Sequence, residues 1–124
     1  MRSFKLTVNP FQRRLLLVVG GDKDKILKAI SKHRMGRELR SAVSQDPPDP
    51  TEEACVYTDD KYGRFLLYFP KWGNKDCMST LTHECHHIVK DIMTHIGENK
   101  AKETPAYLQE WLIKELKKLL QKTK

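Results

Sequence analysis

The stretch Leu81–Asp91, "LTHECHHIVKD", carries three histidines, a glutamate and a cysteine at five consecutive positions. At 100° per residue its apolar side chains fall on one face of a helix, whereas His83 and His87 fall on the opposite face. The apolar positions, continued past the stretch, are Leu81, Cys85, Ile88, Val89, Ile92 and Ile96. The periodicity therefore predicts a long amphipathic helix, which begins at Asp76 or Ser79 and continues to about Ile96.

The histidine spacing on this helix matches a known metal-binding pattern. Positions four apart lie on one helix face, so His83 and His87 can direct their imidazoles at one ion. Glu84 lies beside them and completes the pattern HExxH, in which two imidazoles hold Zn²⁺ and the glutamate takes a proton from the attacking water. The simpler interpretation is a polar helix surface that happens to carry histidines. A third ligand would distinguish the two, because catalytic zinc sites have three protein ligands.

Residues near the motif supply the candidates for that third ligand, which are Cys85, His86, Asp91, His95, Glu103 and Glu110. Cys85 lies on the apolar face, His86 points away from the motif histidines, and His95 is too far along the helix axis. These three are therefore excluded as ligands of the same ion. Asp91 shares a face with His87 and is either a partner that orients this imidazole or a solvated aspartate.

The two glutamates lie beyond the end of the helix. Gly97 is a helix-terminating residue, and the turn from Gly97 to Lys102 allows the next helix to fold back against the first. Glu103 would then face the two histidines from the start of that next helix. Glu110 is the alternative third ligand if Glu103 lies too close to the turn.

The rest of the chain predicts two β-hairpins and two more helices. The expected strands are Phe4–Val8, Arg13–Val19, Cys55–Thr58 and Arg64–Phe69, and the expected helices run from Lys23 to about His33 and from Thr104-Pro105 to about Leu120. Asp22 is the expected N-cap of the first helix. The proline-rich segment Ser44–Glu53 is expected to form a surface loop. We therefore predict an α+β fold, with residues 1–124 forming one domain.

Composition limits the classes of protein to which this chain can belong. The 124 residues include 39% hydrophobic residues, and the longest apolar runs are too short to cross a bilayer. The N-terminal sequence lacks the apolar stretch of a secretory signal, so a cytoplasmic location is expected. The three cysteines, Cys55, Cys77 and Cys85, form no CxxC pair, which favours free thiols over a disulfide framework.

The formal net charge of +7 raises the question of nucleic-acid binding. Basic residues gather in two regions, from Lys28 to Arg40 and along the C-terminal helix. On the C-terminal helix the lysines alternate with leucines, as on a solvated face above a buried stripe. A nucleic-acid partner is possible on this distribution but is not favoured.

The residues "HECHHIVKD…ETPAYLQEWL" resemble the zincin metallopeptidases, and specifically the gluzincins, in which a glutamate downstream of HExxH completes the zinc site. The resemblance is closest to small phage-encoded proteins in which a short turn leads from HExxH to an E-x-x-A-Y helix, and it covers about residues 65–116. A phage origin would place the protein in the host cytoplasm. The family implies a minimal zincin-like domain, in which β-hairpins precede an HExxH helix and a C-terminal helix.

The resemblance implies roles for individual residues. His83, His87 and Glu103 would bind Zn²⁺, and Glu84 would act as general base and acid. Many gluzincins have an aspartate four residues after the third ligand, where this chain has Tyr107; this side chain is expected either to donate a hydrogen bond to an oxyanion or to pack.

The strand before the HExxH helix also has a counterpart in the family. Zincins bind an extended substrate along an edge strand beside that helix, and Arg64–Phe69 holds the corresponding place in the sequence. The alternative is a plain core strand, because apolar residues alternate on both of its faces.

The function expected from these features is zinc-dependent hydrolysis of a peptide or amide bond, with a peptide or protein as substrate. A non-catalytic zinc-binding interaction protein and a basic nucleic-acid-binding protein are the alternatives. The sequence predicts no oligomeric state.

Overall fold

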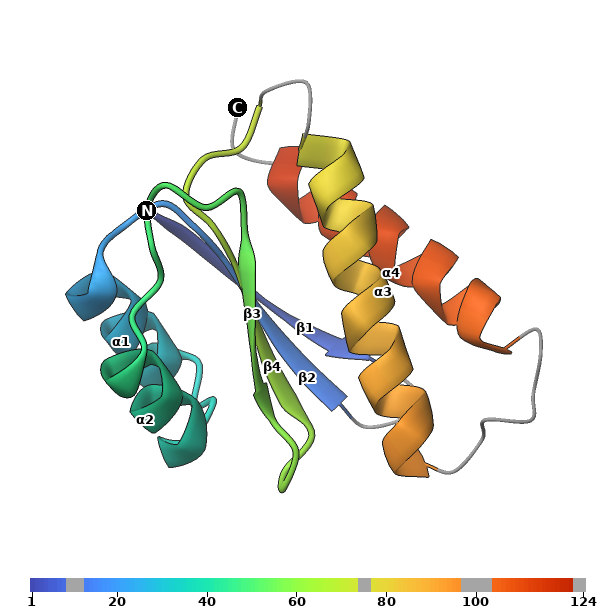
Figure 1. Cartoon of the computed structure of the whole chain (residues 1–124), viewed down its shortest axis with the longest axis horizontal. Coiled ribbons are helices and arrows are strands. Elements are labelled where there is room, and N and C mark those ends of the chain that lie inside the picture. Colours follow the sequence, from blue (N-terminus) through green and yellow to red (C-terminus); the bar gives the residue numbers. More distant parts are fainter. Residues whose placement is uncertain (9–12, 74–76, 97–103, 122–124) are drawn as a thin grey trace. The chain divides into compact units, whose positions relative to one another are not determined.

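The computed structural model describes residues 1–8, 13–73, 77–96 and 104–121. The chain divides into two compact units, Met1–Asn74 and Lys75–Lys124. Helices and a mixed sheet together make an α+β fold, as predicted (Figure 1). The expectation of one domain over residues 1–124 stays a prediction. Within the described residues, none of the helices combines the length and apolarity needed to cross a membrane.

The first unit is built on a four-stranded sheet with two helices on one face (Figure 1). Its elements are β1 (Arg2–Val8), β2 (Arg13–Val19), α1 (Lys23–Lys32), α2 (Arg37–Gln45), β3 (Cys55–Asp59) and β4 (Arg64–Phe69). The predicted hairpins are confirmed, because β1 pairs antiparallel with β2 and β3 pairs antiparallel with β4. A parallel pairing of β2 with β4, with Leu16 opposite Leu66, joins the hairpins in the order β1-β2-β4-β3.

The strand β4 lies in the interior of this sheet, which corrects one expectation. It is paired with β2 on one side and β3 on the other, so it has no open edge along which a substrate strand could pair. Five of its six side chains are buried: Phe65, Leu66, Leu67, Tyr68 and Phe69. The alternation of apolar residues on both faces therefore marked a core strand, and the edge-strand interpretation of Arg64–Phe69 was wrong.

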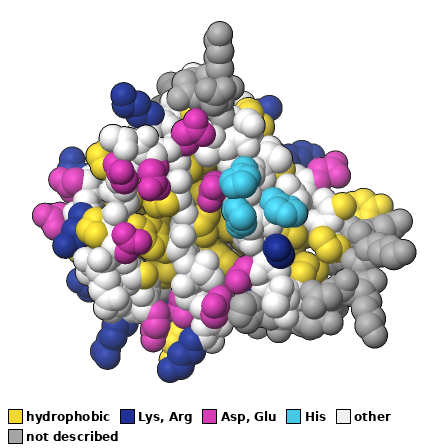
Figure 2. Space-filling model, viewed as in Figure 1, with side chains coloured by type: hydrophobic (Ala, Val, Ile, Leu, Met, Phe, Trp, Pro, Cys, Tyr) yellow, Lys and Arg dark blue, Asp and Glu magenta, His cyan; other side chains and the backbone are white. Residues whose placement is uncertain are grey.

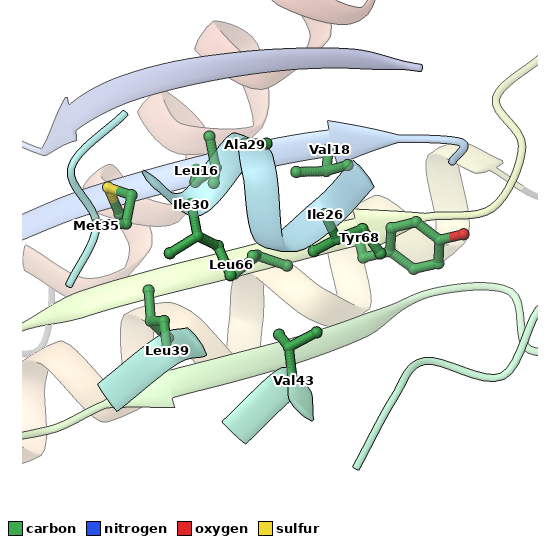
Figure 3. Packing of buried hydrophobic residues seen from close by; sticks show 10 residues of the cluster. All are labelled: Leu16, Val18, Ile26, Ala29, Ile30, Met35, Leu39, Val43, Leu66 and Tyr68. Carbon is green, nitrogen blue, oxygen red and sulfur yellow. The ribbon is translucent and has the colours of Figure 1, made fainter. Parts of the chain in front are cut away.

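The buried core between the sheet and α1 and α2 holds the first unit together (Figure 3). It contains Leu16, Val18, Ile26, Ala29, Ile30, Met35, Leu39, Val43, Leu66 and Tyr68. Asp22 is the N-cap of α1, as predicted, and its Oδ1 accepts a hydrogen bond of 3.0 Å from the backbone N–H of Lys25. Burial of a Leu or Ile side chain contributes about 1.5–3 kcal/mol, so this layer fixes α1 and α2 against the sheet.

Helix α2 was not predicted, and the loop that was expected to begin at Ser44 begins only after Gln45. Its N-cap is Gly36, with a φ of 98° and no side-chain hydrogen bond, so the usual capping signal is missing. A Cβ at Gly36 would collide with the Arg64 guanidinium. The backbone conformation therefore favours glycine there, and a larger residue would also make the Arg64 side chain move.

The second unit consists of α3 (Cys77–Ile96) and α4 (Thr104–Gln121), which pack against each other. Both helices agree with the predicted ranges to within one or two residues. Five of the side chains that were placed on the apolar face of α3 are buried, namely Leu81, Cys85, Ile88, Val89 and Ile92, whereas the side chain of Ile96 lies outside the described residues. The buried stripe of α4 is Leu108, Leu112, Leu116 and Leu120, at intervals of four residues. The two amphipathic faces therefore supply the apolar packing of this unit.

Candidate functional site

The two motif histidines come together on the exposed face of α3. Their Nε2 atoms are 3.0 Å apart, and the ring centroids are 4.6 Å apart with the ring planes at 87°. Both side chains are exposed. Figure 2 shows histidine side chains gathered in one patch on the surface. The helix geometry that was expected to direct both imidazoles at one point is thus present.

The separation of these nitrogens fits two ligands of one Zn²⁺ ion. Nitrogens bound at about 2.0–2.1 Å in tetrahedral geometry lie about 3.3 Å apart. The observed Nε2–Nε2 distance of 3.0 Å is close to that value, and exposed side chains can adjust by a few tenths of an ångström. The same distance also suits an N–H···N hydrogen bond, in which one neutral imidazole donates to the other.

The residues between the two histidines lie in different environments. Glu84 follows His83 directly in α3 and is half-buried, so its side chain is partly accessible to solvent. Cys85 is fully buried on the apolar face of α3. Burial raises the pKa of the Cys85 thiol to about 12, and the nearby Glu84 charge adds to this effect. Cys85 therefore stays a protonated thiol at neutral pH, which agrees with its exclusion as a metal ligand.

Some candidates for the third ligand lie outside the residues that the structure describes. Glu103 is not among them, and neither is the side chain of His95, so the role of Glu103 stays a prediction. Within the described parts of the chain, no group of three or more histidine, cysteine, aspartate or glutamate side chains is arranged to hold a metal ion. Glu110 is described and exposed, and it is not grouped with His83 and His87.

Tyr107 is exposed, with 66% of its surface accessible to solvent. The packing role that was considered for this residue is therefore not seen in the structure. Its role as hydrogen-bond donor to an oxyanion stays a prediction. Two residues further along α4, the Gln109 side-chain amide donates a hydrogen bond of 3.4 Å to the Thr82 carbonyl oxygen, next to the motif.

A cavity between α3 and α4 was not foreseen from the sequence. It measures about 450 Å³ and is lined by His86, Val89, Lys90, Met93, Thr94, Pro105, Ala106 and Gln109. His86, whose ring centroid is 6.2 Å from that of His87, links this cavity to the histidine pair. The apolar residues Val89 and Met93 are four positions apart on α3, which is also the ordinary pattern of a packed helix face. The sequence alone therefore offers no signal for the cavity.

Comparison of the chain with protein-family models, with curated proteins and with solved structures gives no match.

Proposed function

We propose that this protein is a zinc-dependent hydrolase of peptide or amide bonds, with its active site on the exposed face of α3. The observation that carries the proposal is the convergence of the His83 and His87 Nε2 atoms to 3.0 Å, with the half-buried Glu84 at the next position after His83. Neutral imidazoles at this spacing can share one Zn²⁺ ion, and Glu103 is the proposed third ligand. The resemblance of "HECHHIVKD…ETPAYLQEWL" to the gluzincins supports the same assignment.

The chain's own residues account for the chemistry that such a site needs. Zinc, when bound, polarises the substrate carbonyl and lowers the pKa of the attacking water. Glu84 takes the proton from that water and delivers it to the leaving amine, a shuttle for which its half-buried position beside His83 is suited. Tyr107 is proposed to donate a hydrogen bond to the oxyanion. Three protein ligands would leave a position open for the substrate.

Three single variants test this proposal, with metal content and cleavage of a mixed peptide library as the two measurements. His83→Ala is expected to lose both zinc and activity. Glu84→Gln is expected to keep zinc and lose activity, because the amide can no longer accept the proton. His86→Ala is the matched control, since it removes an exposed imidazole of the same helix that is not spaced to share the ion, and it should keep both. Zinc content in His83→Ala equal to that of the wild type would refute the proposal.

A zinc-binding interaction protein without catalysis is the second candidate. The exposure of His83, His87 and Tyr107 favours it, because an open site encloses a substrate poorly. The Glu84→Gln variant separates the two functions. An interaction protein would bind zinc and its partner equally well with either side chain, and the wild-type protein would cleave no peptide in the library.

A further inference from the structure

A second cavity lies within the first unit, where α1 and α2 meet. It measures about 570 Å³ and is lined by Ile30, Ser31, Arg34, Gly36, Arg37, Arg40, Ser41, Ser44 and Gln45. Three of these residues carry a positive charge and none carries a negative one. Three serines add hydroxyl groups, which can donate hydrogen bonds to the same ligand. The lining therefore combines strong cationic donors with small neutral donors.

The helical spacing of α2 explains why its polar side chains face this cavity together. Arg37, Arg40, Ser41 and Ser44 occupy positions i, i+3, i+4 and i+7, which form one stripe along a helix. The apolar residues Leu39 and Val43 point instead into the core. In the part of the chain that the structure describes, no carboxylate forms an ion pair with Arg34, Arg37 or Arg40. Their charges are thus available to a ligand.

Arg34 completes the cavity from the end of α1, at a position that normally favours glycine. It follows the C-cap His33 with a φ of 54°. Its backbone N–H donates to the Ser31 carbonyl at 3.2 Å, and that of Met35 donates to the Ile30 carbonyl at 3.0 Å. These two bonds make a Schellman motif, whose left-handed residue is usually glycine. A non-glycine residue in this conformation costs about 1 kcal/mol, and here it adds a third guanidinium to the cavity.

We propose that this cavity binds a small ligand carrying two or more phosphate groups, such as a nucleoside diphosphate. Planar guanidinium groups pair with phosphate oxygens through two parallel hydrogen bonds, and three of them can neutralise a multiply charged anion. A cavity of this size is typical of small-molecule sites, which range from about 300 to 1,000 Å³. Nucleic acid, by contrast, is bound by charges spread along a strand. The inference is independent of the zinc site.

The test uses inorganic pyrophosphate and ADP as probes, titrated by calorimetry into the full-length protein after zinc has been removed. Removal of zinc prevents pyrophosphate from binding to a metal instead of to the arginines. Each probe is expected to bind at one site per chain. Arg37→Ala and Arg40→Ala are each expected to weaken binding by about tenfold or more, as for the loss of a charge-assisted hydrogen bond. Lys117→Ala removes an exposed charge from α4 and is expected to change binding less than twofold.

Arg34→Gly separates a role in binding from a role in folding. Glycine suits the left-handed backbone at this position, so the variant should stay folded by circular dichroism and urea unfolding. It should nevertheless bind both probes about tenfold more weakly. The proposal is overturned if the three arginine variants bind as the wild type does, or if Lys117→Ala weakens binding as much as they do. It is also overturned if a single-stranded oligonucleotide binds more tightly than either probe and displaces it.

Discussion

The histidine pair on α3 yields a quantitative prediction, because two side chains that share one ion cannot contribute to its binding independently. The perturbation is a double-mutant cycle of His83→Ala, His87→Ala and the variant with both substitutions. The two Nε2 atoms, 3.0 Å apart, need to separate by only about 0.3 Å to reach tetrahedral zinc geometry. Little reorganisation is therefore needed before both can bind.

The expected magnitude follows from the energy of zinc binding divided among its ligands. Structural zinc sites with four ligands bind with about 10–16 kcal/mol, or about 3 kcal/mol for each ligand. Loss of either histidine should therefore weaken zinc binding by about 100-fold. Once one histidine is gone, the other can no longer chelate the ion together with a second imidazole, so most of its contribution is already lost. The double variant should then be only slightly weaker than each single one, which gives a coupling energy of about 2–3 kcal/mol.

Zinc dissociation constants for the cycle can be measured by competition with a chromophoric chelator at neutral pH. His86→Ala serves as the control, because its imidazole is exposed on the same helix but lies off the line of His83 and His87. If the two substitutions add, so that the coupling energy is close to zero, the histidines bind zinc separately or not at all. In that case the 3.0 Å contact is a hydrogen bond between neutral imidazoles, and the reasoning from geometry to a shared ion fails.

Three further predictions test the environments of single residues. Arg34→Gly should raise the free energy of unfolding, measured in urea, by about 0.5–1 kcal/mol. Glycine relieves the strain of the left-handed backbone, and the greater backbone entropy of glycine in the unfolded chain offsets part of this stabilisation; a lower free energy of unfolding would contradict this. With its pKa raised to about 12, the thiol of Cys85 stays protonated as pH rises to 8 and should resist alkylation until denaturant is added, as measured by mass spectrometry; labelling at the same rate in the folded protein would be inconsistent with its burial. Leu66→Ala, at a fully buried position of β4, should cost about 2–5 kcal/mol in urea unfolding, and a cost below about 1 kcal/mol would mean that the surrounding core can collapse around it.

Much of the secondary structure could be predicted because its signals are local. Strands β2 and β4 begin and end at the predicted residues, since Gly20 and Pro70 follow their apolar runs directly. The first helix begins after the cap at Asp22, whose side chain accepts a hydrogen bond from the backbone N–H of Lys25, only three residues later. The hairpin pairings follow from the short connections between neighbouring strands. In each of these cases the residues that determine the structure are close together in the chain.

Helix α2 was missed because its local signals are weak. In "RELRSAVSQ" only Leu39 and Val43 are buried, so the apolar stripe is one residue wide. The residue before it is Gly36, which usually indicates a turn. The spacing of Leu39 and Val43 by four residues was the available signal, and the two arginines and two serines on the other side are consistent with a solvated helix face. The arginine-lined cavity was missed with the helix, because it exists only once α2 lies beside α1.

The parallel pairing of β2 with β4 could not be read from the sequence at all. It joins residues such as Leu16 and Leu66, which are 50 positions apart, and no turn or spacing marks it. The continuous apolar runs of β2 and β4 indicate that both faces of each strand are buried, which places these strands in the interior of a sheet. The runs do not indicate which strand pairs with which. The substrate role considered for Arg64–Phe69 failed on this point, since a strand with neighbours on both sides has its backbone hydrogen bonds already in use.

The geometry of the candidate zinc site also depends partly on residues that are close in the sequence and partly on residues that are distant in it. His83, Glu84 and His87 lie within two turns of one helix, so their spacing fixes their relative positions before any tertiary contact forms. A third ligand from α4 depends instead on the connection between α3 and α4 and on the packing of the two helices. The Gln109 contact with Thr82 shows that α4 approaches the motif, and the double-mutant cycle needs only the two histidines. Zinc binding by the pair can therefore be established or refuted independently of the third ligand, whose identity determines whether a bound ion would be a catalytic one.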